Sequence, residues 1–271
     1  MPTAAGIVLA GGRSTRMGTP KAALEWHGST LLRHVVGLVA RGVEGPVVVV
    51  RAAGQPLPAL PAAVEVVDDA REGRGPLQGL AAGLAAVGGR ADVAYASSTD
   101  APLLHPAFVR RVLRALDDDV DVVLPHARGF PQPLAAAYRT TLLERIELRL
   151  ADDRVRLAEL FDECRVRRLD EAQLLADRDL ALVDPELDSL VNLNEPADYE
   201  AARARPAPEV VVQGVGTVRA ATLGAAAQAA GVERVVATLN GAQASRDREL
   251  PLVAGDVIAF TADSPPRSSR R

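Results

Sequence analysis

The chain has 271 residues, of which 48% are hydrophobic and 24% charged, a composition typical of globular proteins. Its formal charge of −4 argues against a protein that binds nucleic acid through bulk electrostatics. No apolar run reaches the roughly 18 residues that a membrane-spanning helix needs, so we expect no membrane segment. The one cysteine, Cys164, allows no internal disulfide, and we expect a cytoplasmic protein.

Strand-like and helical patterns alternate through the first two hundred residues. Apolar runs predict strands at 5–10, 46–50, 64–67, 91–97 and 120–124, with further segments at 134–138 and 164–169. Helical spacing predicts helices at 29–40, capped by Ser29, at 77–87, at 106–116, between 140 and 161, and from about 195. This alternation is typical of an α/β protein with a Rossmann-like, mostly parallel, doubly wound sheet that is covered on both faces.

A segment with two prolines, residues 203–208, interrupts the last of these helices and predicts a linker. We therefore expect a first domain at 1–205 and a second at 206–271. The second domain has strand-like segments and one alanine-rich helix, which predict a small α+β fold: strands at 210–212, 235–239 and 257–260, and a helix at 220–230. Residues 263–271 are rich in Ser, Pro and Arg and predict a frayed tail.

Lys21 is the only lysine of the chain, and it closes a glycine-rich loop after the first predicted strand. Ligands of open parallel sheets bind beyond the carboxyl ends of the strands. Glycine backbone N–H groups, together with the cations Arg13, Arg16 and Lys21, favour an anionic ligand there. The spacing matches neither a Walker A loop nor a dinucleotide fingerprint. The alternative is an ordinary turn, but the concentration of positive charge favours a phosphate site.

Asp100 follows the predicted strand at 91–97, where it could hold Mg²⁺ on a ligand's phosphates. A loop or helix-capping aspartate is an equally good interpretation of that residue. Asn192 and Asn194 flank a single leucine, so both amides face one side of an extended segment and could bind a substrate. Asn194 could also cap the helix that follows.

Several sequence blocks occur in a fixed order between about residues 4 and 203. They are Leu9-Ala10-Gly11-Gly12, Ser14, Arg16-Met17-Gly18 and Lys21, then Asp68, Gly75-Pro76-Leu77, Gly79, Thr99-Asp100-Ala101-Pro102, Gln132-Pro133-Leu134, Ala136, Tyr138, Asn192, Asn194 and Pro196. Together they resemble the molybdenum cofactor guanylyltransferases, within the wider nucleotidyltransferase fold. Two positions depart from the family pattern, because Pro20 replaces an aspartate before the lysine and Arg51 stands where a polar amide is common.

The resemblance implies transfer of GMP from GTP to molybdopterin, with release of pyrophosphate, Mg²⁺ as cofactor and no covalent intermediate. It implies catalytic roles for Lys21, Arg16 and Asp100, with Asp100 also binding the metal. It implies nucleotide binding by Leu9, Ala10, Gly11, Gly12, Lys21, Asp68, Gly79 and Asp100, and acceptor binding by Asn192 and Asn194. The alternatives are a cytidylyltransferase, a nucleotidyltransferase with another phosphorylated acceptor, and a non-catalytic nucleotide-binding scaffold.

The segment from about 209 to 263 resembles the small ubiquitin-like sulfur-carrier proteins, which have the β-grasp fold. The blocks that carry this resemblance are Leu239-Asn240-Gly241, Arg246-Asp247, Leu252, Gly255-Asp256, Ile258 and Phe260. Sulfur carriers end in Gly-Gly, whereas this sequence ends in Ser268-Ser269-Arg270-Arg271. We therefore expect a docking or structural domain, with proteins of the molybdenum cofactor pathway as possible partners.

Overall fold

The computed structural model describes residues 3–11, 20–69, 71, 73–242 and 244–261. The chain divides into two compact units, the first comprising residues 1–26 and 30–202 and the second residues 27–29 and 203–271. None of the helices in the described residues combines the length and apolar character that crossing a bilayer requires. Gly12, Arg16 and the predicted tail at 263–271 lie outside the described residues.

An eight-stranded sheet forms the centre of the first unit, with the order β10-β7-β9-β6-β1-β4-β5 and with β8 paired to β7. Its strands are β1 (Ala4–Leu9), β4 (Val47–Ala52), β5 (Glu65–Asp69), β6 (Val93–Ser98), β7 (Val122–Ala127), β8 (Phe130–Pro131), β9 (Ala135–Arg139) and β10 (Val166–Leu169). The pairs that β9 makes with β6 and β7 are antiparallel, as is the β7–β8 pair, and the others are parallel. The predicted mostly parallel sheet is confirmed.

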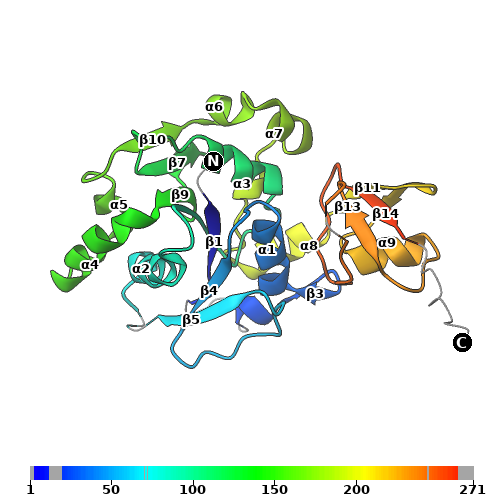
Figure 1. Cartoon of the computed structure of the whole chain (residues 1–271), viewed down its shortest axis with the longest axis horizontal. Helices are drawn as coiled ribbons and strands as arrows, with labels where there is room; N and C mark the ends of the chain where they lie inside the picture. The colour runs from blue at the N-terminus through cyan, green and yellow to red at the C-terminus, as the bar shows by residue number, and fades with distance from the viewer. Residues whose placement is uncertain (1–2, 12–19, 70, 72, 243, 262–271) are drawn as a thin grey trace, which may run out of the picture. The chain divides into compact units, whose positions relative to one another are not determined.

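Helices cover both faces of this sheet (Figure 1). They are α1 (Leu31–Ala40), α2 (Pro76–Val87), α3 (Pro106–Arg114), α4 (Leu143–Ala151), α5 (Leu157–Leu160), α6 (Glu171–Leu175), α7 (Arg178–Val183) and α8 (Pro196–Arg203). Short 3₁₀ helices are η1 (Lys21–Ala23), η2 (Thr140–Leu142) and η3 (Asp188–Leu190), and β2 (Glu25–Trp26) pairs with β3 (Ser29–Thr30). Buried side chains of α2, α4 and α5 share one hydrophobic core with β1, β6 and β7.

Two glycines let helices approach β1 closely from opposite faces of the sheet. A Cβ at Gly6 would lie 2.4 Å from Val39 of α1, and a Cβ at Gly83 of α2 would lie 2.5 Å from Ile7. Because neighbouring residues of a strand point to opposite faces, Gly6 faces α1 and Ile7 faces α2. The packing of α1 and α2 thus holds β1, whose carboxyl end leads into the glycine-rich loop.

The structure differs from the sequence predictions at several element ends. The first helix begins at Leu31, and the residue that caps it is Thr30, whose Oγ1 accepts a hydrogen bond from the N–H of Arg33 at 3.4 Å. Ser29 lies one residue before this cap, at the start of β3. The predicted helical region at 140–161 is broken into η2, α4 and α5.

The second unit contains a four-stranded sheet and one helix. The strands are β11 (Glu209–Val212), β12 (Gly216–Arg219), β13 (Ala237–Leu239) and β14 (Val257–Phe260), in the order β12-β11-β14-β13, and the helix is α9 (Leu223–Ala229). The central pair, β11 and β14, is parallel, whereas both outer pairs are antiparallel. Leu223 and Ala226 of α9 pack in a core with alternate residues of β11, such as Val210. β12 was not predicted, because its residues are mostly exposed and show no apolar alternation.

We predict that Gly83→Leu destabilises the first unit by about 1–3 kcal/mol, because the added side chain would overlap Ile7 in a closely packed core. The control is Ala85→Leu, on the exposed side of the same helix, which adds a similar side chain without burying it. Thermal unfolding of both variants measures the effect. Equal melting temperatures would contradict a close contact between α2 and β1.

Candidate functional site

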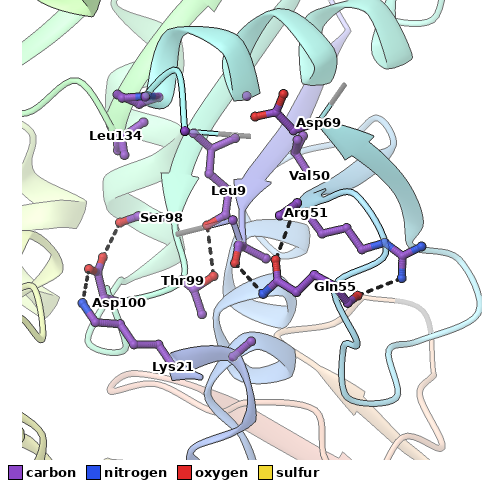
Figure 2. A pocket seen from close by; sticks show the side chains of 18 residues that line it. Leu9, Lys21, Val50, Arg51, Gln55, Asp69, Ser98, Thr99, Asp100 and Leu134 are labelled. Atoms are coloured by element: carbon purple, nitrogen blue, oxygen red, sulfur yellow. Dashed lines mark hydrogen bonds and ion pairs between the residues drawn. The ribbon is translucent and has the colours of Figure 1, made fainter. Parts of the chain in front are cut away.

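A cavity of about 580 Å³ lies at the carboxyl ends of β1, β4, β5 and β6 (Figure 2). Its lining consists of Leu9, Ala10, Gly11, Lys21, Ala22, Val50, Arg51, Ala52, Gln55, Asp69, Gly73, Gly75, Pro76, Gly79, Ser98, Thr99, Asp100 and Leu134. Parallel strands end at the same edge of a sheet, so residues far apart in the sequence meet there. Six residues with predicted site roles line this cavity: Leu9, Ala10, Gly11, Lys21, Gly79 and Asp100.

The end of β1 is tied to the loop that carries Asp100. Leu9 pairs with Ser98 in the sheet register, and the carbonyl of Leu9 accepts hydrogen bonds from Thr99 N at 3.3 Å and Thr99 Oγ1 at 3.0 Å. Thr99 is buried, so its hydroxyl is desolvated and needs this partner. The contact holds the end of β1 and the segment that carries Asp100 at neighbouring positions of the cavity wall.

Lys21 and Asp100 form an ion pair at this wall, although 79 residues separate them in the sequence. Lys21 Nζ lies 2.9 Å from Asp100 Oδ2, and Ser98 Oγ donates to Asp100 Oδ1 at 2.5 Å. Each of the two charged side chains is 20% exposed, so both charges are partly desolvated. Figure 2 shows the pair on one side of the cavity, with Ser98 beside it.

Gln55 holds the opposite wall in place and was not identified from the sequence. Its Nε2 donates to the Ala10 carbonyl at 3.1 Å, and its Oε1 accepts from Ala52 N at 3.1 Å (Figure 2). Arg51 Nη1 donates to the carbonyl of Gln55 at 3.0 Å. One amide thereby joins the strand-end backbones of β1 and β4. The sequence holds no signal for this role, because Gln55 lies in a loop whose path is fixed only by tertiary contacts.

Asp68 and Asp69 occupy different positions. Asp69 lines the cavity, whereas Asp68 accepts a hydrogen bond from Arg51 Nε at 2.6 Å and is absent from the lining. The predicted strand ended at 67, but β5 continues through Asp69, so the two carboxylates alternate between faces. Asp68 therefore reaches the cavity only through Arg51, the residue that departs from the family pattern.

A second cavity, of about 220 Å³, adjoins the first and shares Ser98, Asp100 and Leu134 with it. Its other lining residues are Tyr95, Ser97, Ala101, Gln132, Pro133, Ala135, Ser189, Leu190, Asn192 and Asn194. Leu193 N donates to the backbone carbonyl of Asp100 at 2.9 Å, which holds the asparagine segment against the strand end. Both predicted acceptor-binding asparagines thus lie beside Asp100.

The wall that carries these asparagines is braced by a buried carboxylate. Asp184 accepts hydrogen bonds from the backbone N–H of Asp188 at 2.6 Å and of Ser189 at 3.2 Å. Burial raises the pKa of Asp184, and the hydrogen bonds from Ser189 partly oppose that change. At the start of α8, Asp198 accepts from the N–H groups of Asn194 and Glu195, both at 2.9 Å. Asp198 therefore holds the backbone that leads into α8, while Asn194 lines the smaller cavity.

Histidines near the site have structural contacts. His34 Nε2 lies 2.9 Å from the carbonyl oxygen of Pro102, which positions the loop after Asp100. His105 caps α3, where its Nδ1 accepts from Ala107 N at 3.1 Å. In the part of the chain that the structure describes, no three His, Cys, Asp or Glu side chains gather as a metal site. A divalent ion at Asp100 would therefore need oxygen atoms of a ligand and water as well.

Comparisons with known proteins identify the family of this chain. Residues 6–171 match the family model described as the MobA-like NTP transferase domain. The chain is 40% identical over 169 residues to the probable molybdenum cofactor guanylyltransferase of Mycobacterium marinum, covering 61% of this chain and 82% of that protein. It is 33% identical over 205 residues to the molybdenum cofactor guanylyltransferase of Desulfosudis oleivorans, covering 75% and 96%.

Solved structures show the same fold. The molybdopterin-guanine dinucleotide biosynthesis protein A of Archaeoglobus fulgidus matches with a TM-score of 0.58 at 20% identity, over 73% of this chain and 96% of that one. A nucleotidyl transferase of Methanothermobacter matches with a TM-score of 0.54 at 24% identity, over 74% and 96%. The parallel strand ends, the glycine-rich loop and the family match over residues 6–171 lead to one conclusion: the chain belongs to the MobA-like NTP transferase family.

Proposed function

We propose that the protein transfers GMP from GTP to molybdopterin and releases pyrophosphate. The observation that carries this proposal is the position of the Lys21–Asp100 pair, at the junction of two adjoining cavities. A transferase of this kind must hold a donor and an acceptor next to each other, with the reacting phosphates at their junction. The names of the two molybdenum cofactor guanylyltransferases described above support these two substrates.

The larger cavity is the GTP site in this proposal. Its volume of about 580 Å³ falls in the range of ordinary ligand pockets, which is about 300–1,000 Å³. The backbone of Leu9, Ala10 and Gly11 lies along the nucleotide. Gly79 has no side chain, so the nucleotide can come close to α2 at that position. Gly12 and Arg16 complete the phosphate loop by the family resemblance.

Asp69 is the carboxylate of the nucleotide wall, and Asp68 acts through Arg51. The smaller cavity takes the acceptor, with Asn192 and Asn194 at its rim. Those two amides can each donate and accept hydrogen bonds, which suits the polar edges of a pterin.

Mg²⁺ is the cofactor we propose, with Asp100 as its protein ligand. The residues fit, since a carboxylate has about four lone-pair sites and Lys21 and Ser98 occupy only part of them. Mg²⁺ usually takes one or two carboxylates, with water and phosphate oxygens completing its shell. When bound, the ion neutralises charge on the triphosphate and on the leaving pyrophosphate.

The protein's own residues position the reactants and stabilise charge. A phosphate oxygen of the acceptor forms a bond to the α-phosphorus of GTP, and the bond from that phosphorus to the β-phosphate bridging oxygen breaks. Lys21 supplies positive charge beside the phosphates as negative charge shifts to the leaving group. The hydroxyls of Ser98 and Thr99 donate hydrogen bonds to the Asp100 carboxylate and the Leu9 carbonyl, so they hold the site together instead of attacking the substrate. Direct transfer without a covalent intermediate follows.

The second unit has a separate role in this proposal. Its parallel central strands, flanked by antiparallel strands and one helix, fit a β-grasp domain beginning near residue 206. We propose that this domain docks a protein of the molybdenum cofactor pathway. A single cysteine in 271 residues suits the reducing cytoplasm, where we propose that the protein acts.

We predict that purified protein releases pyrophosphate from GTP only when molybdopterin and Mg²⁺ are both present. CTP, ATP and UTP should give much slower release, and chelation by EDTA should stop the reaction with GTP. Pyrophosphate release, measured with a coupled assay for each nucleotide, tests the proposal. Release with CTP alone would identify a cytidylyltransferase, and GTP binding without turnover would indicate a scaffold.

We predict that Asp100→Asn and Lys21→Ala each lower kcat at least about 100-fold, because charge that stabilises the transition state is lost. Lys21→Arg should recover only part of the activity, since the guanidinium is a wide planar fork rather than a compact charge. Asp153→Asn is the control, because it breaks a surface ion pair in which Asp153 is 91% exposed. Its kcat should stay near that of wild type, and a loss in Asp153→Asn similar to that in Asp100→Asn and Lys21→Ala would contradict the assignment.

Gln55 provides a further test, which concerns the part of the larger cavity formed by Ala10 and Ala52. We predict that Gln55→Leu raises KM for GTP several-fold with little change in kcat, because the Ala10 carbonyl loses its donor. Gln55→Glu should have the larger effect, since a carboxylate oxygen then faces the Ala10 carbonyl oxygen while Ala52 N keeps its acceptor. Steady-state kinetics with varied GTP measure both. If neither variant changes KM, Gln55 does not position the nucleotide wall.

A further inference from the structure

Tyr95, in the middle of β6, has a buried hydroxyl with no hydrogen-bond partner among the described residues. The whole side chain is 0% exposed, yet Tyr95 is one of the residues that line the smaller cavity. Buried polar atoms are nearly always paired, and an exception calls for an explanation such as a missing ligand. Burial also raises the pKa of Tyr95, so the hydroxyl keeps its proton and remains a donor.

A second buried tyrosine shows the usual solution within the same sheet. Tyr138, on β9, pairs with Ala94 in the strand register and is also 0% exposed. Its hydroxyl donates to the carbonyl of Pro133 at 2.7 Å. Tyr95 and Tyr138 therefore have similar burial in adjacent strands, but only Tyr138 has its hydroxyl satisfied by the described protein.

The buried part of the lining near Tyr95 contains two serines among apolar residues such as Leu190. Ser97 and Ser189 are each 1% exposed, whereas Asn192 and Asn194 of the same lining are exposed. Ser189 Oγ already accepts a hydrogen bond from His105 N at 2.9 Å, and Ser97 Oγ donates to the carbonyl of Ser98 at 3.3 Å. Both serine hydroxyls thus have hydrogen-bond partners, whereas the described residues provide no acceptor for the Tyr95 hydroxyl.

We propose that Tyr95 is a specificity-determining residue for the acceptor, and that its hydroxyl donates a hydrogen bond to a ring carbonyl or ring nitrogen of the bound acceptor. The inference rests on the proposed function, which places the acceptor in this cavity. Ser98, beside Asp100, lies three positions after Tyr95 in β6, which is about 10 Å along an extended strand. In this proposal the heterocycle of the acceptor lies toward Tyr95 and its phosphate lies toward Asp100.

The experiment is Tyr95→Phe, which removes one oxygen atom and preserves the ring that fills the core. We expect KM for molybdopterin to rise about tenfold at saturating GTP, because a desolvated hydrogen bond is lost. KM for GTP and kcat should stay within about twofold of wild type. The melting temperature of the substrate-free variant should not fall, since no protein hydrogen bond is broken.

Tyr138→Phe is the matched control, and it should lower the melting temperature because it removes the bond to Pro133. Unchanged KM for molybdopterin in Tyr95→Phe would overturn the inference and indicate that the hydroxyl donates its hydrogen bond to a bound water molecule. A lower melting temperature with an equal rise in KM for both substrates would overturn it in favour of a structural role. If wild type shows no turnover, the proposed function fails separately, and calorimetric titration of both proteins with molybdopterin still tests Tyr95.

Discussion

The ion pair between Lys21 and Asp100 is the interaction on which the rest of the site depends. It joins the end of the glycine-rich loop to the end of β6, and these segments are 79 residues apart in the sequence. Three further contacts converge on the same place: Thr99 binds the end of β1, Ser98 binds the Asp100 carboxylate, and Leu193 binds the Asp100 backbone. Positive charge, a carboxylate and both cavities are thereby held at one edge of the sheet.

This arrangement suits chemistry in which the protein contributes position and charge. Phosphoryl-type transfer between two bound substrates needs no protein nucleophile, and the hydroxyls nearest Asp100 are engaged in structural hydrogen bonds. The two walls of the larger cavity differ accordingly. One wall carries the charged pair, and the other carries Gln55, whose amide fixes backbone atoms that lie along the proposed nucleotide.

The sequence predicted the sheet well, because buried strands such as β1 and β4 are continuous apolar runs that few other structures can accommodate. It also placed Lys21, Asp100 and the asparagines at strand ends, where topology brings them together. The sequence did not indicate that Asp69 lines the cavity and Asp68 does not, since one residue of strand length decides which carboxylate faces it. Gln55 and Tyr95 carry no local pattern, and their importance arises only from partners in three dimensions.

The hydrogen bond from Leu193 N to the carbonyl of Asp100 joins an early and a late segment of the chain, and the two cavities draw on these segments differently. Most of the larger cavity, the proposed nucleotide site, comes from segments up to Asp100, whereas much of the smaller cavity, the proposed acceptor site, comes from residues 132–135 and 189–194. The later segments could therefore change during evolution while the donor machinery is retained. A fold built in this way can acquire new acceptors by altering two short segments, residues 132–135 and 189–194, which offers a route to the divergence of nucleotidyltransferases that keep one nucleotide site but modify different molecules.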